Sequence, residues 1–417
     1  MSYIMRFFKN KLIRNSLIYT LGSMITPLVG LIMLPIFTKF LDPSEYGVMV
    51  TIQTLVGLLQ LFLVLSLHGA ITRFYYDFVN DDEKSREYLG SIFTFVVILA
   101  SILAITLIIF RDTIGGVLFK TISIDPYFYY LVGLAWILGV SSLQMALIRV
   151  QEKAGLFILI NIIRELLIMI STTYLIMGKG WGADSALISQ FTINIIVVLF
   201  TFGIQLKFFK LSLNVNHIKR SLIFSIPLIP HVASSWIINS SDKVILEKFV
   251  PIAEVGIYSL AVQVSMVLVL FYSSINNAIV PQYTRLRTEG KEEIASRMLK
   301  KFSYIVIFFG IISIPIAIYA IKLFASKEYY SAISIIPFLL VGKVLTGLYY
   351  IPVAKLFYEK KTKAIAMSST VSAVINVLIN LVLIPLIGVS GAIASTMVSE
   401  LLRYVFIFKA SKKSYSI

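Results

Sequence analysis

The stretch KFLDPSEYG, from Lys39 to Gly47, recurs as KFVPIAEVG, from Lys248 to Gly256. The two copies share Lys, Phe, Glu and Gly at matching positions without a gap. Each copy closes one long apolar run and precedes the next, and SLIY at Ser16 is likewise matched by SLIF at Ser221. A motif that returns in the same topological position indicates an internal repeat. The sequence therefore predicts two homologous halves.

The composition predicts a membrane protein. Of the 417 residues, 58% are hydrophobic and only 14% are charged, whereas about a quarter of the residues of a soluble protein are charged. The net charge of +16 does not indicate a nucleic-acid partner, because the basic residues lie in short segments between apolar spans. The chain has no cysteine, which excludes disulfides, thiolate metal sites and cysteine nucleophiles.

A spanning helix needs about 20 apolar residues, and this length predicts about twelve spans. They cover residues 16–40, 46–67, 89–110, 127–148, 155–177 and 185–205 in the first half, and 221–249, 256–280, 302–325, 333–358, 364–387 and 391–408 in the second. The predicted class is an all-α polytopic membrane protein with two six-helix bundles. We expect an N-terminal lobe at 1–205, a cytoplasmic linker at 206–220 and a C-terminal lobe at 221–417. Because six is even, the lobes should be related by a pseudo-two-fold axis along the membrane normal.

Lysine and arginine predict the orientation, since loops rich in them stay in the cytoplasm. They concentrate at both ends of the chain and in alternate loops, and the loops on the other side hold few. The basic set includes Arg6, Lys9, Lys11, Arg14, Arg73, Lys84, Arg86, Lys207, Lys210, Lys219, Arg220, Arg285, Arg287, Lys291, Lys300, Lys301, Lys409, Lys412 and Lys413. Both termini are therefore predicted to be cytoplasmic, and the basic N-terminus is interpreted as a retained lead-in and not as a signal peptide.

Prolines interrupt the first predicted helix of each half. Pro27 and Pro35 lie in one, and Pro227 and Pro230 lie in the other. Proline removes a backbone donor and kinks a helix, and interrupted helices at corresponding positions of two repeats indicate a transport pathway. The alternative is a kink that serves packing alone.

Several charged residues fall inside predicted spans, where a charge at the bilayer centre costs about 2.5–3.5 kcal/mol. Lys243 and Lys343 are expected to face a water-filled interior, with Asp242 beside Lys243. Arg164 and Glu165 fit either a cavity or a mutual pair. Glu400 and Arg403 lie three residues apart and are expected to form a structural ion pair. His231 follows Pro230 and could titrate near neutral pH, although a satisfied polar contact is the plainer interpretation. The sequence contains no His/Asp/Glu cluster at metal-ligand spacing.

The motifs resemble those of a known family. The opening NSLIYTLGSMITPLVGLIMLPIFTKFLDPSEYGVMVTIQTL, residues 15–55, resembles the start of bacterial polysaccharide repeat-unit flippases. The same family often shows RFYYD after the second helix, here Arg73 to Asp77, and an Asp-Lys pair late in helix seven followed by GIYSLA. Here these are Asp242 with Lys243, and Gly256 to Ala261. The resemblance covers nearly the whole chain.

The resemblance implies the fold of the multidrug/oligosaccharidyl-lipid/polysaccharide exporter superfamily. It implies transfer of an undecaprenyl-diphosphate-linked oligosaccharide from the inner to the outer leaflet of the bacterial cytoplasmic membrane by alternating access. The protein would not be an enzyme and would need no cofactor, although an H⁺ or Na⁺ gradient could drive it. Membrane lipids, a polysaccharide polymerase and glycosyltransferases would be its partners, and a monomer is expected.

The function implied by the resemblance suggests roles for individual residues. Lys243 would bind the substrate headgroup, Lys343 and Arg164 would extend the positive lining, and Arg73 would meet the incoming diphosphate at the cytoplasmic mouth. Asp242 would orient Lys243 or carry a coupling ion. Glu165 and His231 are the other candidates for ion coupling.

Two alternatives stay open. A cation-coupled drug exporter of the same superfamily would carry an acidic cavity, but here the acids within spans are roughly balanced by bases. A membrane polymerase or glycosyltransferase would need catalytic residues in sizeable outer loops. The longest predicted outer loop, 111–126, is short.

Overall fold

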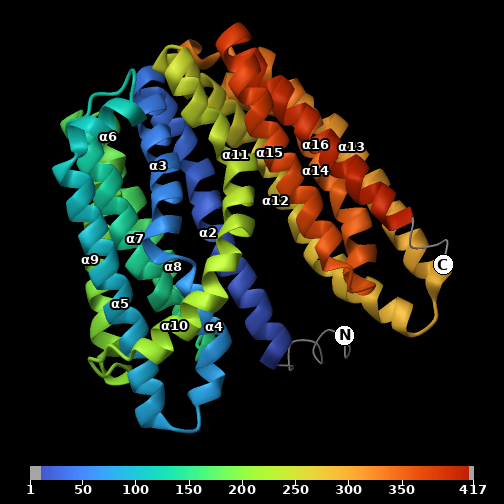
Figure 1. Ribbon diagram of the computed structural model, residues 1–417. Coiled ribbons are helices and arrows are strands. Elements are labelled where there is room, and N and C mark those ends of the chain that lie inside the picture. The colour runs from blue at the N-terminus through green and yellow to red at the C-terminus, as the bar shows by residue number, and fades with distance from the viewer. Residues whose placement is uncertain (1–10, 413–417) are drawn as a thin grey trace. The chain divides into compact units, whose positions relative to one another are not determined.

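The computed structural model describes residues 11–412, apart from the side chains of residues 11–17, 20, 23, 231 and 235. The described chain is helical throughout, with no strand (Figure 1). Its elements are α2 (Lys11–Phe40), α3 (Pro43–Val64), α4 (Leu67–Phe78), α5 (Asp82–Ile109), α6 (Arg111–Leu118), α7 (Tyr127–Val150), α8 (Ala154–Tyr174), η1 (Leu175–Lys179), α9 (Ala183–Gln205), η2 (Leu206–Phe208), α10 (Val215–Ser225), η3 (Ile226–Leu228), α11 (Ile229–Phe249), α12 (Ile252–Thr288), α13 (Glu292–Phe324), η4 (Lys327–Tyr329), α14 (Ala332–Tyr358), α15 (Thr362–Ile387) and α16 (Val389–Lys412).

The helices confirm the predicted all-α polytopic class. Between residues 11 and 412, ten helices are long and apolar enough to cross a membrane, and a bent pair formed by Val215–Ser234 and Trp236–Phe249 makes an eleventh span. In α2 the apolar helix Met24–Phe40 is shorter. With α2, these elements correspond to the twelve predicted spans, and the chain is a multi-pass membrane protein.

Two predicted spans differ from the structure. The span predicted at 221–249 is interrupted by the short 3-10 helix η3, which contains Pro227. Proline cannot donate the backbone hydrogen bond that a continuous helix needs. The span predicted at 46–67 ends at Val64, because Leu65 and Ser66 adopt left-handed backbone conformations with φ of 50° and 56°. Such residues end a helix, and hydropathy alone does not reveal them.

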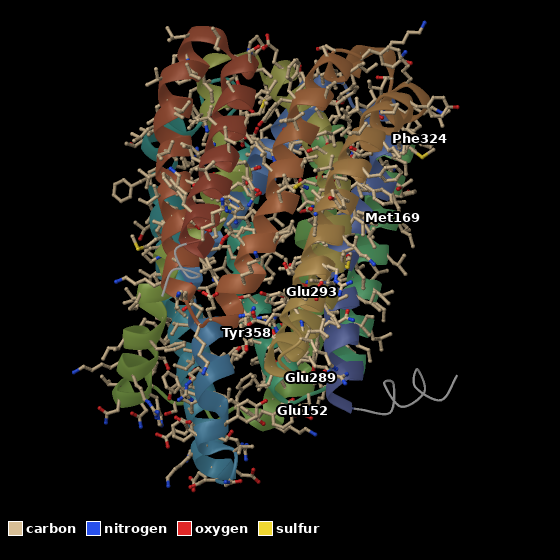
Figure 2. All side chains as sticks on the ribbon, turned by 90° about the vertical axis from the view of Figure 1, so that its right-hand side faces the viewer. Glu152, Met169, Glu289, Glu293, Phe324 and Tyr358 are labelled. Carbon is tan, nitrogen blue, oxygen red and sulfur yellow. The ribbon has the colours of Figure 1, made fainter. Side chains whose placement is uncertain are left out.

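α12 and α13 extend beyond the apolar thickness of a membrane. At 1.5 Å per residue, α13 is much longer than the roughly 30 Å of hydrocarbon. Glu289 and Glu293 lie at one end of this helix pair, and Phe324 lies at the other (Figure 2). The charged end carries its own ion pairs: Lys291 and Arg285 each approach Glu289 to 2.7 Å and lower its pKa to about 2.

The chain packs as two units. Of the described residues, 11–40 and 52–232 form one unit, and 41–51 and 233–412 form the other. Residues 206–232 pack within the first unit, and the beginning of α3 packs within the second. The lobes at 1–205 and 221–417 stay a prediction.

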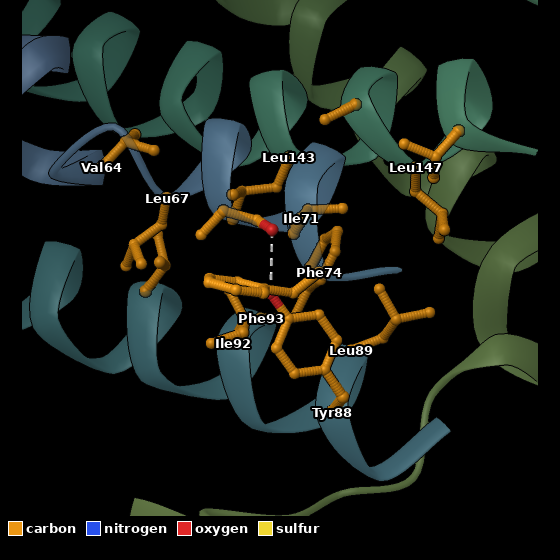
Figure 3. Close-up of a cluster of buried hydrophobic side chains, with 14 of the residues drawn as sticks. Val64, Leu67, Ile71, Phe74, Tyr88, Leu89, Ile92, Phe93, Leu143 and Leu147 are labelled. Carbon is orange, nitrogen blue, oxygen red and sulfur yellow. Dashed lines mark hydrogen bonds between the residues drawn. The ribbon is translucent and has the colours of Figure 1, made fainter. Parts of the chain in front are cut away.

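A hydrophobic cluster of α4, α5 and α7 forms part of the core of the first unit (Figure 3). The Tyr88 hydroxyl at its centre donates to the Ala70 carbonyl at 3.1 Å and lies 3.3 Å from the Ser221 hydroxyl of α10. Buried polar groups need such partners. The tyrosine therefore links α10 to the helices that span the membrane.

Gly90 of α5 allows the chain after α9 to pack closely. An alanine Cβ there would lie 1.8 Å from the carbonyl oxygen of Lys210, so Gly90→Ala must displace residues 209–214. We expect a lower unfolding temperature and faster tryptic cleavage after Lys207 and Lys210. Gly155→Ala is the matched control, because a Cβ at this helical glycine meets nothing within 4 Å. Equal cleavage in both variants would contradict the prediction.

Candidate functional site

A buried group of charges lies inside the second unit, where α11, α12 and α14 carry it. The Asp242 side chain is 5% exposed. Its carboxylate accepts hydrogen bonds from the Lys243 backbone N–H at 2.9 Å and from the Tyr258 hydroxyl of α12. Tyr258 belongs to the GIYSLA motif, so the two sequence motifs meet here.

Lys243 lies close enough to Asp242 and to Lys343 for their charges to interact. Lys343 of α14 is only 7% exposed, and Lys243 is half-buried. The charge of Lys243 interacts with those of Asp242 and Lys343. Among the described side chains, no carboxylate oxygen lies within ion-pairing distance of either ammonium. Lys243 therefore interacts with one carboxylate and with a second ammonium, and these three charges sum to a net positive charge within the membrane-spanning part.

A ladder of amide and hydroxyl groups lies beside this charge group. Ser241 donates to Asn376 at 3.4 Å, Asn380 donates to Asn376 at 3.1 Å, and Asn376 donates to Ser399 at 3.1 Å. Ser395 donates to Asn380. All five side chains are buried. The sequence reasoning missed this ladder, although Asn376 with Asn380, and Ser395 with Ser399, repeat at the four-residue spacing that places side chains on one helix face.

The expected ion pair on α16 is confirmed. Arg403 lies 3.5 Å from Glu400, and its guanidinium stacks over the Tyr349 ring at 3.9 Å. The pair is nearly closed to solvent. The two charged side chains therefore pair with each other, and neither adds to the charge group around Asp242.

In the first unit, Arg164 and Glu165 form a mutual pair on α8. Their side chains approach to 3.2 Å, and Arg164 also donates to Asn161 at 2.8 Å. The Thr26 hydroxyl of α2 donates to Glu165 at 2.7 Å. Thr26 precedes Pro27, so Glu165 holds α2 next to one of its two internal prolines. Arg164 is largely neutralised, which makes it a weaker anion ligand than Lys243.

The remaining predicted residues are dispersed. Arg73 is an exposed residue of α4 and lies 3.4 Å from Asp77, which also pairs with Arg220. Pro27 and Pro35 lie inside α2, Pro227 lies in η3, and Pro230 lies at the start of α11. The side chain of His231 lies outside the described part. Within residues 11–412, no three His, Cys, Asp or Glu side chains are grouped so as to hold a metal ion.

Comparison with known proteins identifies relatives along most of the chain. Residues 12–287 match the model of a family described as polysaccharide biosynthesis protein. The chain is 23% identical over 377 residues to a Haloferax volcanii protein named "Probable low-salt glycan biosynthesis flippase Agl15", covering 87% of this chain and 75% of that protein. It is 25% identical over 411 residues to an uncharacterized membrane protein of Haemophilus influenzae, covering 92% and 94% of the two chains.

Two solved structures share the fold. An inward-facing multidrug resistance transporter of the MATE family superimposes with a TM-score of 0.73 at 16% identity, covering 96% of this chain and 98% of that one. The lipid II flippase MurJ, in an inward closed conformation, gives a TM-score of 0.73 at 15% identity, covering 95% and 87%. At this sequence identity the structural likeness shows a common fold. It carries no information about whether the substrates are the same.

Proposed function

The chain belongs to the polysaccharide biosynthesis protein family, and from that premise we propose that it flips undecaprenyl-diphosphate-linked oligosaccharides across the cytoplasmic membrane. Repeat units would pass from the inner to the outer leaflet by alternating access, for export of a surface polysaccharide. Both termini would be cytoplasmic, and a polymerase and glycosyltransferases would act before and after transfer. A relative named as a glycan biosynthesis flippase supports this class of substrate.

The observation that carries the proposal is that Lys243 lies near a second buried lysine, Lys343, with Asp242 beside it. A diphosphate cannot enter hydrocarbon unaided, because stripping an ion of water is prohibitive. Two ammonium groups in a membrane interior are costly for the same reason. A bound diphosphate would neutralise both lysines. The attraction between the diphosphate and the ammonium groups would then offset the cost of removing water from all of them. A cationic drug would add to the unbalanced positive charge.

The other parts of the substrate need different surroundings. Sugars require hydrogen-bonding groups and water, whereas the polyprenyl chain is soluble in the lipid itself. Arg73 is exposed on α4 and suits a first contact with the diphosphate at the cytoplasmic mouth. Arg164, paired with Glu165, would contribute a smaller positive potential.

Coupling to a proton or sodium gradient would use Asp242. Its carboxylate lies beside a ladder of amide and hydroxyl oxygens, and oxygen ligands suit hard cations. We expect Asp242→Asn to transfer substrate at a rate that no longer responds to an imposed H⁺ or Na⁺ gradient. The Tyr258 hydrogen bond persists in this variant, because an amide oxygen also accepts. The measurement is leaflet transfer in vesicles with each gradient in turn.

Glu165→Gln is the companion to that variant, because Glu165 is the other described acidic candidate. If Glu165→Gln loses the response to the gradient and Asp242→Asn keeps it, the coupling site belongs to the first unit. His231→Gln completes the set of candidates.

Reconstitution of the purified chain tests the function itself. The assay measures loss of lipid-linked oligosaccharide from the outer leaflet of proteoliposomes, beside uptake of a fluorescent cationic drug. Transfer of the lipid without drug uptake is the expected result. The MATE-like fold makes a cation-coupled multidrug exporter the second candidate, and drug uptake without lipid transfer would favour it. A polymerase would instead lengthen the oligosaccharide, which the same assay detects by mass.

A further inference from the structure

The segment that joins α9 to α11 is docked onto the first unit along one side. We call residues 206–227 the docked segment. The Lys210 backbone N–H donates to the Arg86 carbonyl at 3.1 Å, and the Lys210 ammonium pairs with Glu83 at 2.7 Å. Asn214 donates to Glu87 at 2.8 Å. On α10, Arg220 pairs with Asp77, and His217 packs against the rings of Phe78 and Tyr88.

The opposite side of the docked segment is apolar and uncovered. Leu211 is 90% exposed, Val215 is 71% exposed and Ile223 is 67% exposed. A groove of about 450 Å³ runs along α10 and η3, lined by Val215, Ile218, Lys219, Leu222, Ile223, Ile226 and Pro227. A contiguous exposed apolar surface of this kind marks a contact with a membrane or a partner.

Three lysines without carboxylate partners lie on the docked segment or against it. Lys153 and Lys207 both lie over the ring of Phe208, at 4.7 and 5.2 Å, and Lys219 lines the groove. In the described part of the chain, no carboxylate pairs with any of the three. Burial, with a further contribution from the charge of Lys207, lowers the pKa of Lys153. The docked segment therefore combines an exposed apolar side with three nearby lysines that have no described carboxylate partner.

We propose that the docked segment is a binding site for anionic phospholipid. An acyl chain lies in the groove on α10, and the phosphate headgroups are held by Lys219 and by Lys153 with Lys207. The segment runs from the last turn of the span Asp184–Phe208 into the bent span that begins at Val215. Its lysines therefore lie near the membrane surface, where basic side chains meet lipid headgroups. The many basic residues at this end put the site on the cytoplasmic leaflet in the orientation proposed above, where anionic lipid attracts basic segments.

The site differs from the substrate site in place and in ligand. It belongs to the first unit, whereas Lys243 and Lys343 belong to the second. Because the docked segment is the covalent connection between α9 and α11, a bound lipid would favour its docked conformation. Binding can be measured on the whole protein without any assay of transfer, so this inference stands or fails independently of the proposed function.

The test uses the full chain in detergent micelles, with native mass spectrometry to count bound lipids. Phosphatidylglycerol is titrated against phosphatidylcholine of the same chain length. Wild type should prefer phosphatidylglycerol. Each lysine near the surface contributes about fivefold to binding, so the triple variant Lys153→Gln, Lys207→Gln, Lys219→Gln should bind phosphatidylglycerol about a hundredfold more weakly. Its far-ultraviolet circular dichroism and unfolding temperature should match wild type.

A control variant removes the same charge elsewhere. Lys300→Gln, Lys301→Gln, Lys363→Gln changes three exposed basic residues of the second unit and should leave the preference intact. Ile223→Ser should weaken long-chain phosphatidylglycerol more than a short-chain analogue, because only the long chain fills the groove. Equal losses in the two triple variants would overturn the proposal. So would binding of undecaprenyl phosphate in place of phosphatidylglycerol, or an unchanged preference in the first triple variant.

Discussion

Gly256→Ala is expected to destabilise the second unit by about 3 kcal/mol, at the upper end of overpacking costs. A Cβ at residue 256 would lie 2.0 Å from the carbonyl oxygen of Pro43. The obstacle is helix backbone and not a flexible side chain, so α12 and the start of α3 must move apart. The measurement is the unfolding temperature of the purified protein, followed by tryptophan fluorescence.

The contact is reciprocal, which gives a second and sharper expectation. A Cβ at Gly47 would lie 2.2 Å from the carbonyl oxygen of Ile252. Because one separation of the two helices relieves both clashes, the double variant Gly47→Ala, Gly256→Ala should cost little more than either single variant. Gly203→Ala is the control, since a Cβ there meets nothing within 4 Å. Additive losses would show that the glycines act at separate places.

The same contact explains the motif that repeats in the sequence. The pattern predicted that Gly47 and Gly256 occupy equivalent positions in two halves, and it gave no reason for glycine. In the structure the two copies pack against each other, and each glycine admits the backbone of the other copy. Tyr329 completes the junction: its hydroxyl donates to the Leu41 carbonyl at 3.1 Å, and its ring meets the edge of Tyr46 at 6.0 Å. Packing between distant copies has no local signature in either copy.

The hydropathy pattern was sufficient to predict the membrane-spanning helices but not the positions where they are interrupted. Long apolar runs predict spans because lipid requires every backbone group to be satisfied within the helix. The break after Val64 depends on Leu65 and Ser66, two ordinary residues in a left-handed conformation. Neither is glycine or asparagine, which usually signal that conformation. By contrast, η3 contains Pro227 and is followed by Pro230 at the start of α11, and the sequence did predict an interruption there.

The candidate site was predicted residue by residue but not as an assembly. Lys243 and Lys343 each stood out because a charge within an apolar run is costly. Their proximity depends on the packing that brings α11 and α14 into one unit, and nothing in the sequence of either helix specifies that packing. For Arg164 the sequence left two alternatives open, a side chain that faces a cavity or one that pairs with Glu165. The contacts of Arg164 with Glu165 and Asn161 in the structure decide for the pair. Unlike Arg164 and Arg403, neither Lys243 nor Lys343 has a carboxylate within ion-pairing distance among the described side chains. Substitution of these two lysines is therefore the strongest functional test of the site.

Lys243→Ala is expected to reduce transfer of lipid-linked oligosaccharide about thirtyfold, because a hydrogen bond to a charged group contributes about 2 kcal/mol. Lys343→Ala should have a similar effect. The two losses should be less than additive, since both lysines would bind one diphosphate. Lys243→Arg should retain most activity, because the guanidinium keeps the charge and binds phosphate well. The measurement is the initial rate of leaflet transfer as substrate concentration varies.

Stability separates a binding role from a structural one. Removing a lysine that holds the fold together would lower the unfolding temperature in parallel with activity. Here Lys243→Ala should leave that temperature nearly unchanged. The lost attraction to Asp242 is offset by relief of the desolvation of the ammonium and of its repulsion from Lys343, while Asp242 keeps its bond to Tyr258. Lys322→Ala, at the exposed end of α13, should change neither quantity. A fall in stability that matches the fall in transfer would assign Lys243 to packing and remove it from the substrate site. Loss of transfer at full stability, together with rescue by arginine, would leave anion binding as the physical role of this charge.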